Sequence, residues 1–378
     1  MPCTSLSVNR LRLTNFRSYA QLDLRTEASL VVLVGPNGAG KTNILESISL
    51  LTPGRGMRRA TLAEMARNSE NTADEVNQDW AIHAQVNGLL GPAAIGTGVQ
   101  DGHRVVRIDG ETASGSGALG KHLSALWLTP VMDRLFAEGA SNRRRFFDRM
   151  VFGLTPGHGA ESAAYEKALR DRSRLLKERS EKTDWLNILE NRMAIHGVAI
   201  ADARLKAMKE LQSAIDDHLN SVFPRARLTL QGSIEDVLLS GMSVEDAVAY
   251  FNEQLKTRRA RDSDSGGASI GPHKTDLVVY HVETGHVATQ CSTGQQKALL
   301  INTILANMRC QMMRRNVGPI LLLDEVAAHM DHCRRDALFS EVQNIGGQVW
   351  LTGTDREFFK GLEPHADFYT VQESAIMC

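Results

Sequence analysis

The sequence predicts an α/β fold in which a mixed sheet and an antiparallel meander carry an inserted lobe of helices. Three features of the chain indicate this fold. Continuous apolar runs, typical of strands covered on both faces, lie near the two ends of the chain, at 30–34 and 320–323. Short alternating runs at 80–110 are separated by turn dipeptides. From about 126 to 262, apolar residues recur at helical spacing.

The first segment, residues 1–125, begins with two predicted strands, followed by a glycine-rich loop and a helix. Apolar residues mostly alternate with polar ones over 6–13, and the run at 30–34 is the second strand. The helix is expected to begin near Asn43. Three dipeptides that favour tight hairpin turns then follow: Asn87-Gly88, Asp101-Gly102 and Asp109-Gly110. We expect the resulting meander to be attached to the first parallel strand.

The second segment, residues 126–268, is the expected helical lobe. It closes with the polar sequence DSDSGGA at 262–268, which predicts a hinge. The third segment, 269–378, returns to α/β sequence, with a helix at 292–309 and a further buried strand at 348–352. The first and third segments are therefore expected to form one lobe, into which the helical lobe is inserted.

Composition restricts the class of protein. The 378 residues hold 43 Lys and Arg against 44 Asp and Glu, and the net charge of -1 excludes a uniformly basic nucleic-acid coat. An aromatic content of 5% leaves few platforms for stacking single-stranded bases. Scattered cysteines without a CxxC pair indicate a reduced, cytoplasmic protein. No apolar run approaches the ~20 residues of a membrane span, so we expect no membrane partner.

A phosphate loop follows the first buried strand. The pattern GxxxxGK[ST] is matched in full by Gly35, Pro36, Asn37, Gly38, Ala39, Gly40, Lys41 and Thr42. Its glycines let consecutive N–H groups turn toward phosphate oxygens at a helix N-terminus. We expect Lys41 to reach the β- and γ-phosphates of ATP and the Thr42 hydroxyl to ligate Mg²⁺. Asn43, directly after the pattern, is also expected to contact the nucleotide.

An apolar strand that ends in two carboxylates, Asp324 and Glu325, is expected to complete the site. In a parallel sheet we expect this strand to lie beside the phosphate-loop strand. Asp324 would then stand near Mg²⁺, and Glu325 would orient or deprotonate the water that attacks the γ-phosphate. Lys41, Asp324 and Glu325 are therefore the candidate catalytic residues.

The wide separation of these two motifs resembles the ABC-type ATPase heads, in which a helical lobe interrupts the nucleotide core. Those heads carry a serine-glycine signature ahead of the acidic strand, and here Gly294 of STGQ stands 30 residues before Asp324. The resemblance implies that Ser292, Gly294 and Gln295 meet the γ-phosphate bound by a second protomer. A Ser hydroxyl and free N–H groups at a helix start can bind an anion, but the same residues also make an ordinary helix cap.

Further segments are similar to the RecF family of bacterial DNA replication and repair proteins. They include LTNFRSY at 13–19, PGRGMRRA at 53–60, RRRFFD at 143–148, GPHKTDL at 271–277 and LLDEVAAHMD at 322–331. The resemblance implies a cytoplasmic ATPase that forms an ATP-dependent homodimer on double-stranded DNA near gaps or junctions. It also implies RecO and RecR as partners in loading RecA. Asp331 matches a loop that contacts the second protomer, and Thr354 or Asp355 would sense the γ-phosphate.

Local positive charge is expected where DNA is bound. Residues 1–60 hold eight Lys or Arg and three acids, and Arg55, Arg58 and Arg59 are the candidate DNA contacts. Basic residues also cluster at 143–145 and 256–261. Each cluster fits a solvated surface equally well, and 143–145 also fits ion pairs that pin the helical lobe.

The motifs alone leave an alternative function open. An ATPase subunit of an ABC membrane transporter would share the phosphate loop, the signature and the acidic strand. The segments at 13–19 and 271–277 are not typical of such subunits, which favours the RecF family.

Overall fold

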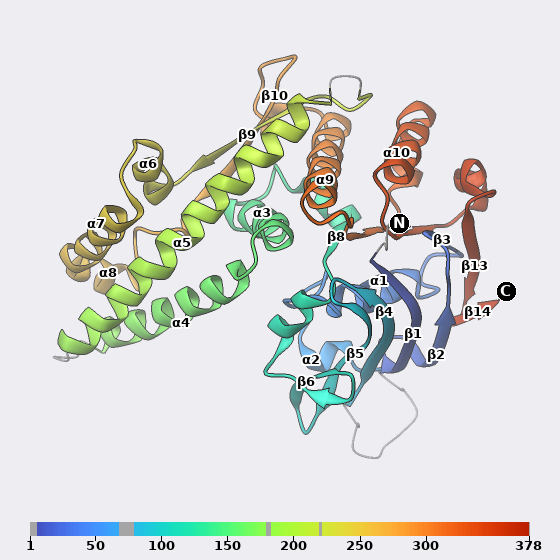
Figure 1. Ribbon diagram of the computed structural model, residues 1–378, viewed down its shortest axis with the longest axis horizontal. Coiled ribbons are helices and arrows are strands. Elements are labelled where there is room, and N and C mark those ends of the chain that lie inside the picture. Colours follow the sequence, from blue (N-terminus) through green and yellow to red (C-terminus); the bar gives the residue numbers. More distant parts are fainter. Residues whose placement is uncertain (1–5, 68–78, 179–182, 219–220, 378) are drawn as a thin grey trace. The chain divides into compact units, whose positions relative to one another are not determined.

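Figure 1 shows the computed structural model of the chain, which describes residues 6–67, 79–178, 183–218 and 221–377. The chain forms two compact units. The first unit comprises Met1–Met132 and Met308–Cys378, and the second comprises Asp133–Asn307. The α/β fold with a mixed sheet, a meander and a helical insertion is confirmed.

The first unit contains the predicted meander as a six-stranded antiparallel sheet in the order β2-β1-β4-β5-β6-β7. Its strands are β1 (Ser7–Phe16), β2 (Tyr19–Arg25), β4 (Ala81–Gly88), β5 (Gly91–Gln100), β6 (His103–Ile108) and β7 (Glu111–Thr112). The alternating apolar residues of β1 and β4 point into the core, as their burial pattern shows. Two of the three predicted turn dipeptides are found at turns: Asp101 and Asp109 have positive φ and are each followed by a glycine. The third prediction was wrong, because Asn87 and Gly88 end β4 and the turn lies at 89–90.

The second sheet of the first unit has the order β14-β13-β3-β12-β11-β8. Its strands are β3 (Leu30–Val34), β8 (Ala125–Leu128), β11 (Ile320–Leu323), β12 (Val349–Gly353), β13 (Ala366–Gln372) and β14 (Ala375–Met377). All neighbours in it are parallel except β14, which pairs antiparallel with β13. Residues 126–128, which belong to β8, were expected at the start of the helical lobe, and this was wrong. A run of four buried residues is too short for its periodicity to distinguish a strand from a helix.

The order of the parallel strands corrects a second expectation. The acidic strand β11 does not pair with the phosphate-loop strand β3, because β12 lies between them and pairs with both. Leu351 of β12 is opposite Val32 on one side and Leu323 on the other. The chain passes from β11 through α10 (His332–Ile345) before it enters this central position. Apolar runs identify strands, but they do not specify which parallel neighbours pair.

The core of the first unit lies between its two sheets and around α1 (Lys41–Leu50). Ile44, Leu45 and Ile48 of this helix belong to one buried cluster with Leu11 of the meander and Trp350 of the parallel sheet. Each such aliphatic side chain contributes about 1.5–3 kcal/mol when fully buried. The helix that follows the phosphate loop is therefore held on both sides by sheets. A short helix, α2 (Leu62–Met65), also belongs to this unit.

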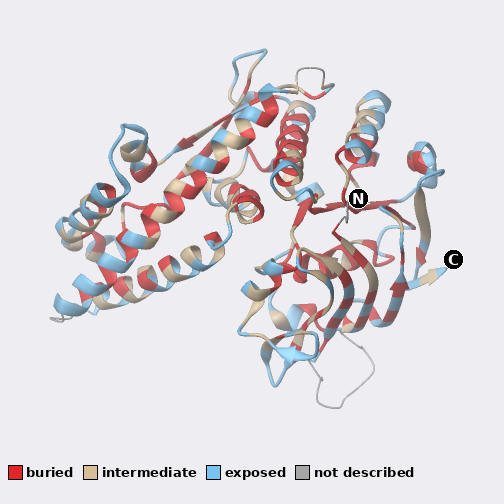
Figure 2. Ribbon diagram, in the orientation of Figure 1, coloured by how far each residue is buried: buried red, intermediate tan, exposed pale blue. Residues whose placement is uncertain are grey.

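The second unit is mostly helical, as predicted. Its helices are α3 (Ala140–Leu154), α4 (His158–Lys177), α5 (Thr183–Asp216), α6 (Ser233–Leu239), α7 (Val244–Thr257) and α8 (Arg259–Ser265), with the first part of α9 (Thr293–Arg315). Buried residues form a stripe along α5, which packs against α4 and α7 (Figure 2). The helical block also contains a strand that was not predicted, β9 (Ala226–Gln231), paired with β10 (Asp276–His281).

The division between the units differs from the segments expected from the sequence. Residues 269–307, expected to belong with the nucleotide-binding lobe, lie in the second unit. The pairing of β10 with β9 explains this, because it joins 276–281 to the helical block. The second boundary of the insertion is thus at Asn307, within α9, and not at 268.

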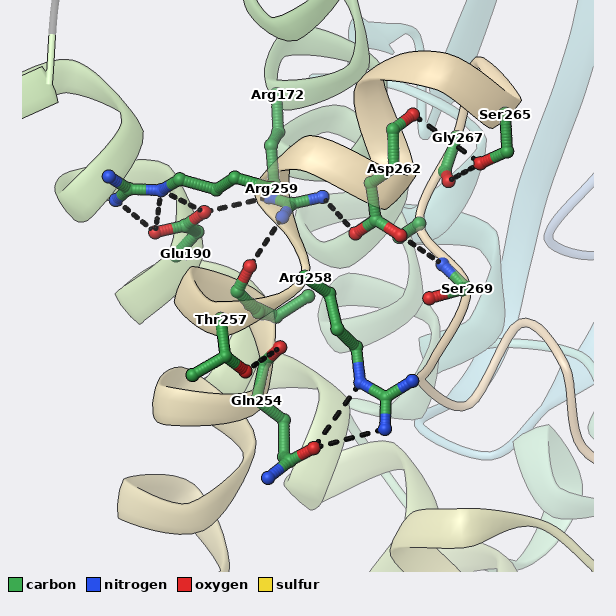
Figure 3. Close-up of polar contacts among 12 residues, drawn as sticks. Arg172, Glu190, Gln254, Thr257, Arg258, Arg259, Asp262, Ser265, Gly267 and Ser269 are labelled. Atoms are coloured by element: carbon green, nitrogen blue, oxygen red, sulfur yellow. Dashed lines mark hydrogen bonds and ion pairs between the residues drawn. The ribbon is translucent and has the colours of Figure 1, made fainter.

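A buried ionic cluster occupies the place of the predicted hinge (Figure 3). Arg172 is fully buried and donates to Glu190 (3.0 Å) and Asp262 (2.8 Å), and its Nη2 donates to the Leu255 carbonyl (2.7 Å). Arg259 also pairs with Glu190. The polar sequence from 262 is therefore not a loop at its start, because α8 continues to Ser265 and Asp262 is buried against Arg172. Buried charges are tolerated only when they are paired in this way.

The described part of the chain contains no helix that is both long enough and apolar enough to cross a bilayer. Among the described residues, Cys291, Cys310 and Cys333 form no disulfide. The remaining cysteines, Cys3 and Cys378, lie outside the described residues.

Candidate nucleotide site

The phosphate loop lies between β3 and α1, in the first unit, where its chemistry requires it. Close approach explains two of its glycines. A Cβ atom on Gly35 would overlap the carbonyl oxygen of Val371, and one on Gly40 would lie 2.7 Å from the Tyr19 hydroxyl. Gly40 also has φ of 106°, which favours glycine, and it caps α1. The turn between β13 and β14 contacts the phosphate loop, because the Ser374 N–H donates to the Ala39 carbonyl (3.1 Å).

Lys41 is buried at the first position of α1, and its ammonium group lies at the phosphate loop. It donates to the carbonyls of Gly35 (2.7 Å) and Pro36 (2.9 Å). Burial lowers the pKa of Lys41, and the charges of Glu325 and Asp324 oppose that shift. The two acids therefore lie near the lysine, as the sequence predicted.

Asp324 accepts hydrogen bonds from two hydroxyl groups. Thr42 Oγ1 and Thr352 Oγ1 each donate to Asp324 Oδ1 at 2.8 Å. Burial raises the pKa of Asp324, and the two hydroxyl hydrogen bonds oppose the shift. A buried carboxylate beside a threonine hydroxyl supplies hard oxygen donors of the kind that Mg²⁺ prefers. Thr42 and Asp324 thus fit the expected metal site. Thr42 Oγ1 and Asp324 Oδ1 are the oxygen atoms that lie close together there.

Glu325 follows the strand end in a constrained backbone conformation. Its φ is 52°, in the left-handed region that residues other than glycine rarely adopt. Its N–H donates to Thr352 Oγ1 (2.9 Å), which fixes this turn to β12. Strained residues of this type occur frequently at active sites, where the surrounding structure holds them in place.

Thr352 is the site residue that the sequence analysis missed. Its hydroxyl donates to Asp324 and accepts from Glu325, so one side chain joins both acids to the neighbouring strand. The only signal in the sequence was its position at the end of the third buried strand, two residues before the predicted sensor Thr354. A threonine in a strand is common, so the spacing alone did not distinguish it.

The three arginines expected to contact DNA lie in different surroundings. Arg58 donates to Asn43 Oδ1 (2.8 Å) and lies 3.4 Å from Glu46, which is fully buried. Its charge also acts on Asp324. All three arginines are exposed, and Arg58 also lies next to the phosphate loop. The predicted nucleotide contact Asn43 is part of the same hydrogen-bonded group.

The signature residues lie in the second unit, at the start of α9. Ser292 Oγ accepts from the Gln295 N–H (3.3 Å), and the Gln295 side chain accepts from the Ser292 N–H (3.0 Å). These reciprocal bonds form a capping box, so the helix-cap interpretation holds. Ser292 and Gly294 are exposed, which leaves the Ser292 hydroxyl proton and the first N–H groups of α9 accessible to an anion.

The remaining candidates are also helix-capping positions or exposed. Asp331 caps α10 by accepting from the Arg334 N–H (2.9 Å). Asp355 accepts from the Glu357 N–H (2.9 Å) at the start of a 3₁₀ helix, whereas Thr354 is exposed directly after β12. Of the two candidate sensors, Thr354 has the side chain that remains available.

Comparison with known proteins gives one consistent result. Residues 7–376 match the family described as RecF/RecN/SMC N terminal domain. The DNA replication and repair protein RecF of Caulobacter sp. (strain K31) is 44% identical over 371 residues, with 94% of each chain covered. RecF of Agrobacterium fabrum (strain C58 / ATCC 33970) is 42% identical and is covered over 100% of both chains.

Solved structures share the fold. The recombination mediator protein RecF-ATP in the RecFOR pathway has a TM-score of 0.84 at 20% identity, covering 99% of this chain and 98% of that one. An Smc head domain from Pyrococcus furiosus has a TM-score of 0.54 at 14% identity, covering 98% and 95%. The phosphate loop, the acidic strand and the inserted helical unit are thus found together with extensive sequence identity. The chain belongs to the RecF family of ABC-type ATPase heads.

Proposed function

We propose that the chain is an ATP-dependent DNA-binding protein of bacterial recombinational repair and replication restart. ATP brings two copies together on double-stranded DNA at gaps or junctions, and slow hydrolysis releases them. The curated relatives are DNA replication and repair proteins, and one solved relative is described as a recombination mediator, which supports this setting. RecO and RecR are the proposed partners in loading RecA.

The observation that carries the proposal is the hydrogen-bonded group of Thr42, Asp324, Thr352 and Glu325 beside Lys41. Thr42 and Asp324 would hold Mg²⁺, which would neutralise charge on the β- and γ-phosphates. Lys41 adds a cation on the same phosphates. Glu325 accepts a proton from the attacking water, or orients it, from a backbone position that Thr352 fixes.

The proposed dimerisation draws on the signature residues of the second unit. Ser292 and Gly294 are exposed at the N-terminus of α9. Ser292 and Gln295 complete the capping box by themselves, without a bound anion. A γ-phosphate held by a second copy fits this anion site. Asp331 and Thr354 are the proposed partner-contacting and γ-phosphate-sensing residues.

The test compares Glu325→Gln with Lys41→Met. Glu325→Gln keeps the phosphate loop and Mg²⁺ ligands, so we expect normal ATP binding with hydrolysis reduced by roughly 10²–10⁴-fold and prolonged retention on duplex DNA. Lys41→Met is expected to lose both ATP binding and ATP-dependent retention. Phosphate release and fluorescence anisotropy of labelled duplex DNA, with and without ATP, measure these effects.

The proposal fails if wild-type protein binds duplex DNA with the same affinity in the presence and absence of ATP. The transporter alternative has no support from the family, since the matched model of RecF, RecN and SMC proteins covers residues 7–376. Copurification of the full chain with the membrane fraction would restore it.

A further inference from the structure

Residues 271–276, here called the 271–276 loop, lead into β10 of the second unit and include its first residue, Asp276. Side chains from four helices hold this loop in place. Two bonds hold its backbone. Arg204 of α5, itself buried, donates to the Pro272 carbonyl (2.7 Å), and Arg144 of α3 donates to the Thr275 carbonyl (2.7 Å). Within the loop, the Lys274 N–H donates to the Gly271 carbonyl (2.9 Å) and closes a turn.

Further bonds hold the side chains of the loop. His273 Nδ1 lies 2.7 Å from the hydroxyl of Tyr165, which belongs to α4. The Thr275 hydroxyl donates to Glu235 of α6 (2.8 Å), which is fully buried. Asp276 accepts a two-pronged pair of bonds from Arg143 of α3, at 2.8 and 2.7 Å. The predicted ion pair of the 143–145 cluster is thus found.

The loop also contains a glycine whose backbone conformation and close contacts favour glycine over other residues. Gly271 has φ of 130°, and a Cβ atom there would overlap the Tyr165 hydroxyl and lie 2.8 Å from the Phe251 ring. A segment that only connects two elements does not require such a constraint. Constrained backbone held by many surrounding groups is more frequent where a side chain must be presented in a fixed place.

Lys274 is the side chain that this arrangement presents. It is exposed, and no hydrogen-bond or ion-pair partner is found for it among the residues that the structure describes. Arg144 lies close by. Burial lowers the pKa of His273, the hydrogen bond to the Ala268 carbonyl opposes the shift, and the charges of Lys274 and Arg144 lower it further. Two cations therefore flank one imidazole.

The imidazole itself acts as a neutral support. His273 Nε2 lies 2.9 Å from the Ala268 carbonyl, which can only accept, so Nε2 carries the proton and Nδ1 accepts from Tyr165. The lowered pKa keeps this tautomer at neutral pH. His273 consequently connects the turn at Lys274 to Tyr165 of α4 and to Ala268, and the imidazole itself carries no charge.

We infer that Lys274, together with Arg144, binds a phosphodiester of the DNA backbone, and that the 271–276 loop exists to hold this contact in place. The inference rests on the proposed DNA-binding function and gives it a residue that lies outside the candidate arginines of the first unit. Backbone phosphates suit a site with two cations and no aromatic platform, because they carry charge but no base sequence. The residues on both sides of Lys274 are bonded to Tyr165 and to the buried Glu235, so the backbone that carries the lysine is fixed.

The experiment measures the affinity of the full chain, with ATP, for labelled duplex DNA as a function of salt. The variants are Lys274→Gln and Lys274→Arg, and the matched control is Lys209→Gln, an exposed lysine on α5 of the same unit. We expect Lys274→Gln to weaken binding roughly three- to tenfold and to reduce the slope of log affinity against log salt by about one. Lys274→Arg and Lys209→Gln are expected to bind as the wild type does.

A further variant tests the positioning. Tyr165→Phe removes only the hydroxyl that holds His273, so every charge remains while the loop loosens. A smaller loss of DNA affinity, with unchanged ATP binding, is expected. Thermal unfolding of each variant confirms that the fold is retained before affinities are compared.

Two results overturn the inference and are distinguishable from failure of the proposed function. If the wild type binds DNA and Lys274→Gln and Lys209→Gln lose equal amounts of DNA affinity, the effect of Lys274 is that of any surface charge and no specific phosphate contact exists. An altered ATP affinity in Lys274→Gln with unchanged DNA binding assigns the lysine to a nucleotide phosphate instead. If wild-type protein with ATP does not bind duplex DNA, the proposed function fails and the inference fails with it.

Discussion

At the scale of single residues, Thr352 determines the geometry of the acidic pair. It is buried in β12, donates to Asp324 and accepts from Glu325. Because β12 separates β11 from the phosphate-loop strand, this threonine is the side chain that connects the two acids to the centre of the sheet. Mutation of residues that orient the ligands of a metal ion typically lowers activity by roughly 10- to 100-fold.

We therefore predict that Thr352→Val reduces kcat for ATP hydrolysis by roughly 10- to 100-fold while KM for ATP changes little. Valine has nearly the same shape but leaves the Glu325 N–H without its acceptor. Steady-state hydrolysis measures the effect. Thr352→Ser keeps the hydroxyl and is the control. Equal activity of the valine and serine variants would show that the hydroxyl has no role in orienting the acids.

The raised pKa of Asp324 predicts a pH dependence. Burial favours the neutral form of the Asp324 carboxyl group, so its pKa in the folded chain lies above the ordinary value of 3.8. Since the group binds more protons folded than unfolded, it opposes folding increasingly as pH rises, unless a metal ion compensates the charge. Stabilisation by Mg²⁺ and ATP should therefore increase as pH rises through this pKa.

Thermal shifts on adding Mg²⁺ and ATP, measured across acidic to neutral pH, test this dependence. Asp324→Asn cannot titrate and controls for the ionisation of ATP itself. A variant that shows the same pH profile as the wild type would contradict the assignment of the metal to Asp324.

The site residues that could be predicted are those whose spacing is dictated by chemistry. Lys41 and Thr42 follow from a loop that must wrap phosphates, and Asp324 from a strand that must end at the same sheet edge. Thr352 could not be predicted, because its role depends on which strands are neighbours. Arg58 stays a predicted DNA contact, and its hydrogen bond to Asn43 could not be predicted because it depends on the turn after α1.

At the scale of elements, the buried ionic cluster of the second unit shows why polar sequence is a poor guide to loops. Asp262 reads as part of a hinge but lies at 1% exposure against Arg172. The partner is distant in the sequence, in α4, so no local pattern reveals it. Apolar strand β8 and strand β9 were missed for a related reason: their pairing partners, not their own short sequences, define them.

Arg172→Met is predicted to destabilise the second unit by about 3–5 kcal/mol, because it leaves Asp262 buried without its charged partner. The exposed Arg170 on the same helix, paired weakly with Glu166, provides the control, and Arg170→Met should cost less than about 1 kcal/mol. Urea unfolding measures both. Similar midpoints for the two variants would show that the buried pairing adds no stability.

At the scale of the whole molecule, a net charge of -1 requires that any contact with DNA be local. Some basic residues are paired inside the chain, including Arg17 with Glu46 and Arg143 with Asp276. A smaller part of the positive charge is therefore left for contacts with DNA on each copy. Weak basic patches bind duplex DNA effectively when two copies bind together. Once one copy is bound, the second contacts the same duplex at a high effective concentration.

The central claim is that ATP couples dimerisation to DNA binding, and sedimentation velocity of Glu325→Gln tests it most directly. Samples with and without ATP are compared in the presence and absence of duplex DNA, at low and high salt. We expect a monomer without ATP, and with ATP a dimer that cosediments with the duplex at low salt. A protein that stays monomeric in saturating ATP, with or without DNA, would contradict it.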